Sequence, residues 1–245
     1  MSRNTVDEMT LWRGTTPEQR SFLGQVLHWF HFRPRALKGA WMLEEPITWE
    51  LYRALDLLPR SLFVNPLLRR LGELDPVVES AVAPLLSCQD LVITPYPSLE
   101  LTGAKSNCRS DLGLGIGLSP RLWIEAKTAP FKHLDLLEQL RAQQLALQSL
   151  SPSEKVAVVA LVPSDSLLKE WPSLPWSALA VALESGRTHL RGAIADPGLR
   201  SGYERLATEM IDRIKSHPKG IATERQNVTP KEHKFKFESR FIGMI

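Results

Sequence analysis

The feature that most constrains the fold is a continuous apolar run near the middle of the chain. Residues 156–162 read Val-Ala-Val-Val-Ala-Leu-Val, and Pro163 ends the run. A strand with one face in water alternates apolar and polar residues, whereas a strand covered on both faces is apolar throughout. The run is also shorter than a typical helix and rich in valine. It therefore predicts a central strand in a sheet that has helices on both faces.

Helices and strands are expected before this run in a definite order. A helix begins at Asp75-Pro76, where a capping residue precedes a proline, and another covers residues 133–150, where leucines recur at helical spacing. Three strands are expected between these two helices, over residues 91–101, 107–114 and 121–127. Pro95 and Pro97 interrupt the first of them, which places it at a sheet edge. The order helix, three strands, helix, strand predicts an α/β fold.

Further helices are expected on both sides of this unit. They cover residues 17–32, 48–58, 176–185 and 202–215. We expect an N-terminal helical segment over residues 1–60, a core domain over 61–215 and a basic C-terminal tail over 216–245. The tail could be an added strand, a partner-binding segment or a nucleic-acid arm.

The composition is that of a globular protein in a reducing compartment. The chain has 245 residues, of which 43% are hydrophobic and 23% charged, with a net charge of +3. Seven basic and three acidic residues fall between Lys215 and Arg240, so the rest of the chain is close to neutral. Two cysteines exclude a disulfide framework and a four-thiolate metal site. With no signal sequence and no membrane-length apolar run, we expect a cytoplasmic protein.

The candidate chemistry centres on Glu125-Ala126-Lys127. Side chains alternate along a strand, so Glu125 and Lys127 share one face. If the strands over 107–114 and 121–127 form a hairpin, with its turn around residue 118, Asp111 lies opposite Glu125. Two opposed carboxylates repel each other unless a cation lies between them, and Mg²⁺ prefers such oxygen ligands. Lys127 could then orient a water or stabilise charge on a phosphate. The alternative is a surface ion pair at a strand end.

These residues resemble the PD-(D/E)XK nuclease superfamily. The resemblance rests on Ser110-Asp111, on Glu125-Ala126-Lys127, on the helix that contains Gln139 and on the strand over 156–162, and it covers residues 74–165. It implies a restriction-endonuclease-like αβββαβ core with a mixed central sheet, to which this chain adds its N-terminal helical segment. Ser110 stands where the family motif has proline. Gln143 stands where the exonuclease-like branch has tyrosine.

The resemblance also implies roles for individual residues. Asp111, Glu125 and the backbone carbonyl of Ala126 are expected to bind the metal, and Lys127 is the expected catalytic lysine. Glu79 is the best-placed further ligand on the preceding helix, with Glu44, Glu45 and Glu50 as alternatives. Four side chains beside the site could contact substrate: Gln139, Gln143, Lys105 and Arg109. Each of the four could equally be an ordinary solvated residue.

The expected function is that of a Mg²⁺-dependent deoxyribonuclease, with Mn²⁺ as a substitute ion and DNA as partner. Small members of the superfamily serve restriction, phage defence or repair, and a homodimer or a partner protein would suit duplex cleavage. The alternative function is a catalytically inactive nuclease fold that binds nucleic acid or a protein.

Overall fold

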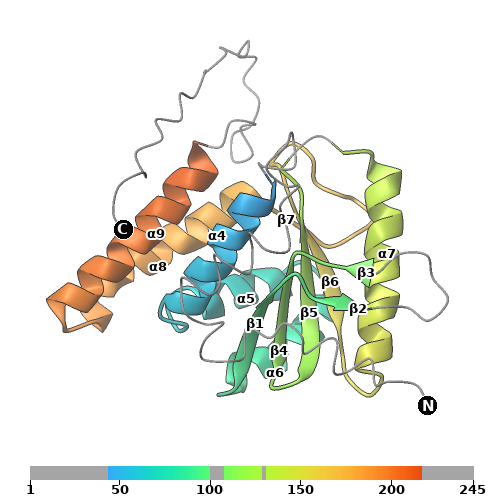
Figure 1. Cartoon of the computed structure of the whole chain (residues 1–245), viewed down its shortest axis with the longest axis horizontal. Helices are drawn as coiled ribbons and strands as arrows, with labels where there is room; N and C mark the ends of the chain where they lie inside the picture. Colours follow the sequence, from blue (N-terminus) through green and yellow to red (C-terminus); the bar gives the residue numbers. More distant parts are fainter. Residues whose placement is uncertain (1–43, 100–107, 129–130, 217–245) are drawn as a thin grey trace, which may run out of the picture.

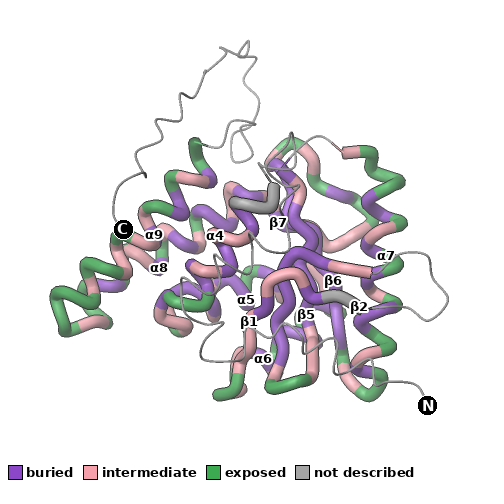
Figure 2. Tube along the Cα trace, in the orientation of Figure 1, coloured by how far each residue is buried: buried purple, intermediate pink, exposed green. Residues whose placement is uncertain are grey.

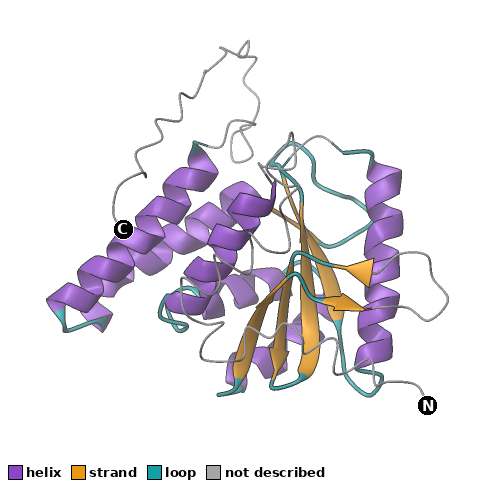
Figure 3. Ribbon diagram, in the orientation of Figure 1, coloured by secondary structure: helices purple, strands orange, loops and turns teal. Residues whose placement is uncertain are grey.

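The computed structural model describes residues 44–99, 108–128 and 131–216, and it has helices packed on both faces of a sheet (Figures 1 and 3). The helices are α4 (Glu44–Leu57), α5 (Val64–Gly72), α6 (Pro76–Ser87), α7 (His133–Leu150), α8 (Trp176–Ala193) and α9 (Pro197–Lys215). The strands are β1 (Leu91–Pro95), β2 (Ser98–Leu99), β3 (Cys108–Arg109), β4 (Leu112–Ile116), β5 (Ser119–Ala126), β6 (Ala157–Val162) and β7 (Ser173–Pro175). The helix expected over residues 17–32 and nearly all of the basic tail lie outside the described ranges.

The central sheet is mixed, and its strand order is β1-β4-β5-β6-β7. β1, β4 and β5 are antiparallel neighbours, whereas β6 and β7 continue the sheet in parallel with β5. α7 connects β5 to β6, as a parallel pair requires. The α/β class and the mixed sheet are therefore confirmed, and β1 occupies the edge predicted from its prolines.

The apolar run forms β6, which is buried along its whole length (Figure 2). Ala157, Val159 and Leu161 face a core that includes α4, α5, α6, α8 and α9. Val158 and Val162 face a second, smaller core beneath α7. Because each face meets its own layer of helices, every position of the strand is apolar, as expected.

The β4–β5 hairpin has the register that the sequence analysis predicted around Asp111. Leu112 pairs with Ile124 and Gly113 with Trp123, so the residue before Leu112 lies opposite Glu125. The turn is Gly117-Leu118, and Gly117 has a φ of +55°, which glycine adopts without a steric penalty. The turn pairs Ile116 with Ser119, and a register shift between Leu114 and Gly115 then gives the pairing of Leu112 with Ile124.

Two helices are longer than their sequences suggested. α8 was expected to end at Ser185, but it continues through Gly186 to Ala193. An added Cβ at Gly186 would lie 2.5 Å from the Leu62 carbonyl oxygen, so glycine permits a close crossing of two segments. α9 begins at Pro197 rather than at Gly202, since Asp196 caps it by accepting the Leu199 N–H at 2.7 Å.

α5 and β7 were not expected from the sequence. None of the helices in the described ranges is long and apolar enough to cross a bilayer.

Candidate metal and phosphate site

Glu125 lies at the end of β5 and is almost completely buried, with 3% of its surface exposed. Its neighbours Ile124 and Ala126 belong to the larger core, whereas Trp123 belongs to the core beneath α7. Alternation along the strand therefore directs the Glu125 carboxylate towards α7. A buried carboxylate is costly unless other groups compensate its charge.

Three side-chain donors contact the Glu125 carboxylate. Lys127 Nζ lies 2.5 Å from Oε1, and Gln139 Nε2 donates to the same oxygen at 2.7 Å. Gln143 Nε2 donates to Oε2 at 2.6 Å. The structure thus brings Glu125 and Lys127 together with Gln139 and Gln143 of α7, and these contacts hold the carboxylate in one position.

Gln143 is wholly buried and connects two strands. Its Nε2 also donates to the Arg109 carbonyl oxygen at 2.7 Å, so one amide ties β3 to Glu125. Its Oε1 is buried and accepts no hydrogen bond from the described residues. A buried acceptor without a donor is uncommon in folded proteins. The same Gln143 amide that donates to Glu125 therefore carries a buried oxygen, Oε1, without a donor among the described residues.

Asp111 is the second buried carboxylate, with 6% of its surface exposed. Its Oδ2 accepts the Ala126 N–H at 2.8 Å across the hairpin. The Ser110 hydroxyl donates to the Ile124 carbonyl oxygen at 2.9 Å, so this serine helps hold the start of β4 against β5. These bonds fix the backbone of Asp111 opposite Glu125.

Lys127 is held by its backbone as well as by its side chain. Its N–H donates to the Leu161 carbonyl oxygen at 2.7 Å, and its carbonyl oxygen accepts the Trp176 indole N–H at 2.9 Å. The side chain is 19% exposed, against 4% for that of Glu125. The ammonium group is therefore the part of the pair nearer to solvent.

Cys108 lies within the electrostatic reach of Glu125. Burial raises the pKa of the Cys108 thiol, and the negative charge of Glu125 raises it further. The sequence analysis did not connect this cysteine with the site, because only the fold brings β3 against α7.

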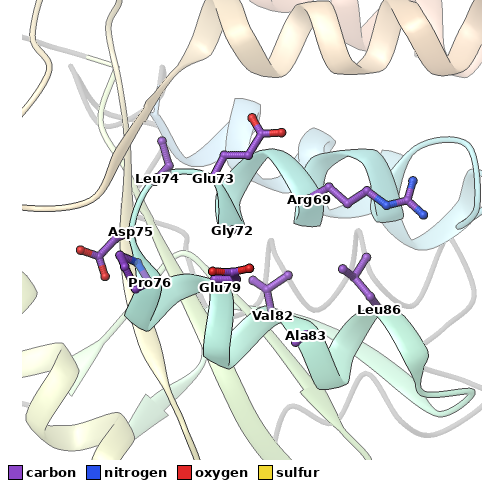
Figure 4. Close-up of a pocket in the computed structure, with 10 residues that line it drawn as sticks. All are labelled: Arg69, Gly72, Glu73, Leu74, Asp75, Pro76, Glu79, Val82, Ala83 and Leu86. Atoms are coloured by element: carbon purple, nitrogen blue, oxygen red, sulfur yellow. The ribbon is translucent and has the colours of Figure 1, made fainter.

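Glu79 does not join Asp111 and Glu125. It is exposed on α6, whose buried side packs into the larger core, on the sheet face opposite to α7. Figure 4 shows Glu79 in a surface groove of about 560 Å³ between α5 and α6, close to Gly72. We therefore leave Glu79 out of the proposed site.

Glu50, one of the alternative acidic candidates, makes a contact elsewhere in the fold. Glu50 Oε2 lies 3.3 Å from Arg213 Nε and joins α4 to α9, and partial burial raises the pKa of Glu50. The side chains of Glu44 and Glu45 lie outside the described set, as does Lys105.

Arg109 lies beside the site, next to a residue that the sequence analysis missed. Its guanidinium carbon is 5.0 Å from the ring centroid of Tyr96, the residue that separates β1 from β2. The Tyr96 N–H donates to the Asp111 carbonyl oxygen at 2.9 Å. The break between Pro95 and Pro97 was visible in the sequence, but its place beside Asp111 follows only from the pairing of β1 with β4.

The oxygen ligands at this position suit a hard divalent cation. Two carboxylates and one ammonium leave a net charge of −1 on these three side chains in a buried setting. Mg²⁺ is commonly held by one or two carboxylates and keeps several waters. Within the described ranges no group of three or more His, Cys, Asp or Glu residues could hold a metal. Asp111 and Glu125 supply two carboxylates, which is within the number that a magnesium site commonly uses.

Comparison with protein-family models, with curated proteins and with solved structures finds no match to this chain.

Proposed function

We propose that the protein is a Mg²⁺-dependent nuclease that hydrolyses phosphodiester bonds of DNA. The observation that carries the proposal is the grouping of Asp111, Glu125 and Lys127 at the end of the β4–β5 hairpin. Asp111 directly precedes the Leu112–Ile124 pair that leads to Glu125, and the Lys127 ammonium group contacts the Glu125 carboxylate. Buried acidic groups next to a lysine are a recurrent arrangement at catalytic sites.

The arrangement of the fold supports the same proposal. Apart from the short strands β2 and β3, the elements α6, β1, β4, β5, α7 and β6 have the order expected for a PD-(D/E)XK core. Of the proposed ligands, Asp111 directly precedes β4 and Glu125 lies on β5. Fold alone does not define an activity, so the argument depends on the site.

In this proposal Asp111 and Glu125 hold Mg²⁺, with Mn²⁺ as a substitute, and the Ala126 carbonyl is a further candidate ligand. The bound ion would stabilise the charge on the phosphate and lower the pKa of a water. Gln139 and Gln143 keep Glu125 in place. In this proposal Lys127 Nζ leaves Glu125 Oε1 and contacts the attacking water or the phosphate. There its positive charge would stabilise the negative charge that develops in the transition state.

One observation favours the alternative of an inactive nuclease fold that binds nucleic acid or a protein. Glu125 Oε1 already accepts two donors, and Oε2 accepts a third. In the alternative, the role of a carboxylate with all these donors is to stabilise the fold and not to bind a metal. The alternative predicts that no divalent cation promotes cleavage.

Cleavage of single-stranded and duplex DNA in Mg²⁺ and in Mn²⁺ tests the proposal. We expect the parent to cut, and Lys127→Ala to lose at least about a hundredfold in rate, in line with the loss of one charged catalytic group. Lys155→Ala is the matched control, because Lys155 is exposed and lies on the loop before β6. Cleavage by Lys127→Ala at the parent rate would show that the assigned mechanism is wrong.

A further inference from the structure

Tyr96 lies in the same row of the sheet as the two carboxylates. β1 and β4 pair as far as Pro95 and Leu112, and the next residue on each strand stays joined through the bond from the Tyr96 N–H to the Asp111 carbonyl oxygen. Asp111 in turn stands opposite Glu125. The order across the three strands is therefore Tyr96, Asp111, Glu125.

The backbone of Tyr96 adopts a conformation that bulky residues avoid. Its φ is +52°, and among the described residues it is the only non-glycine residue with a positive φ. Such a conformation persists only where the surroundings hold it, and it is concentrated at functional sites. Here the Tyr96 N–H and the bond from the Ser110 N–H to the Pro97 carbonyl oxygen, at 2.9 Å, hold the segment on both sides.

Arg109 stacks on the ring that this backbone presents. Its guanidinium carbon lies 5.0 Å from the ring centroid, and its carbonyl oxygen accepts the same Gln143 Nε2 that contacts Glu125. One buried amide thus connects the backbone of Arg109 to the Glu125 carboxylate. Tyr96 itself is only partly buried.

Aromatic rings and guanidinium groups stack on the faces of nucleobases whatever the base. Inside a duplex, both faces of a base are covered by its neighbours, whereas an unpaired base has a face to offer. We propose that Tyr96 and Arg109 form a stacking platform for an unpaired base beside Asp111 and Glu125, and that the substrate is single-stranded DNA. This inference rests on the proposed function in that the bound strand is the strand hydrolysed.

Fluorescence anisotropy in EDTA, where no metal-dependent cleavage occurs, measures binding alone. The probes are a labelled oligothymidylate of about 20 nucleotides, which exceeds the usual site size of one single-strand-binding module, and a duplex of equal length. We expect the parent to bind the single strand more tightly than the duplex. Preference for the duplex, or binding of neither probe, would overturn the platform.

Variants of Tyr96 isolate the ring. Tyr96→Gly removes the ring and suits the positive φ, so it should fold, and we expect it to weaken single-strand binding about tenfold. Tyr96→Phe keeps the ring and should bind as the parent does. Arg109→Lys keeps the charge without the planar group and should also weaken binding. Parent-like binding by Tyr96→Gly, or equal losses in Tyr96→Gly and Tyr96→Phe, would contradict the proposal.

Cleavage measured separately in Mg²⁺ distinguishes this inference from the proposed function. A parent that binds single strands through Tyr96 but cuts no DNA supports the platform and overturns the nuclease. A parent that cuts DNA while Tyr96→Gly binds the single strand as tightly supports the nuclease and overturns the platform.

Discussion

Replacing Gln143 with methionine tests whether this buried amide organises the site. Methionine has a similar length and volume, so the change leaves the packing of α7 nearly intact while it removes both hydrogen bonds of Nε2. Glu125 Oε2 loses the donor at 2.6 Å, and the Arg109 carbonyl oxygen loses the donor at 2.7 Å. We expect Gln143→Met to lower the free energy of unfolding.

The magnitude follows from the contacts. The bond to the Glu125 carboxylate is worth about 1.5–3 kcal/mol and the bond to the Arg109 carbonyl about 1 kcal/mol. Removal of the buried, unpartnered Oε1 returns about 1 kcal/mol. The net loss is therefore about 1.5–3 kcal/mol. Gln139→Met is the matched control on the same helix. Because Glu125 Oε1 keeps Lys127 as a donor in this variant, the free energy of unfolding should fall by only about 0.5–1 kcal/mol.

Urea unfolding followed by far-UV circular dichroism measures both variants. An unfolding free energy of Gln143→Met within about 0.5 kcal/mol of the parent, or a loss equal to that of Gln139→Met, would refute the reasoning.

Two other predictions concern packing and charge. Gly186→Ala should lower the free energy of unfolding by about 1–3 kcal/mol, because its Cβ would lie 2.5 Å from the Leu62 carbonyl oxygen. The control is Gly192→Ala on the same helix, whose Cβ would meet no atom within 4 Å, so its free energy of unfolding should be unchanged or rise by about 0.5–1 kcal/mol. Equal effects of the two substitutions in urea unfolding would refute the close crossing. Because the pKa of the Cys108 thiol is raised by burial and by Glu125, Glu125→Gln should shift the alkylation of Cys108 by iodoacetamide to lower pH, and an unchanged pH profile would contradict the electrostatic contact.

Local signals in the sequence were sufficient for the strands that carry the carboxylates. The apolar run over 156–162 is typical of a strand covered on both faces, and Gly117 indicated where the β4–β5 hairpin turns. Both results depend on side-chain alternation and hairpin geometry, which are properties of short segments.

Features that depend on distant contacts were missed or misplaced. Gly186 lies inside α8, where the close approach of the Leu62 carbonyl oxygen leaves room only for glycine. The local sequence gives no sign of this distant contact. α5 carries buried residues at helical spacing, but Pro59 and Pro66 obscured that pattern. Glu79 was associated with the carboxylates by order along the chain, whereas it is exposed on α6, which packs against the sheet face opposite to α7.

The central claim is that Asp111 and Glu125 together bind a divalent ion. Isothermal titration calorimetry with Mg²⁺ and with Mn²⁺ tests it directly on the parent, Asp111→Asn, Glu125→Gln and, as a control, Glu79→Gln. We predict that the parent and Glu79→Gln bind the ion with the same affinity, and that both site variants lose binding by at least about tenfold, as expected when one of two carboxylate ligands is removed. A parent that binds neither ion, or an Asp111→Asn variant that binds as the parent does, would contradict the claim.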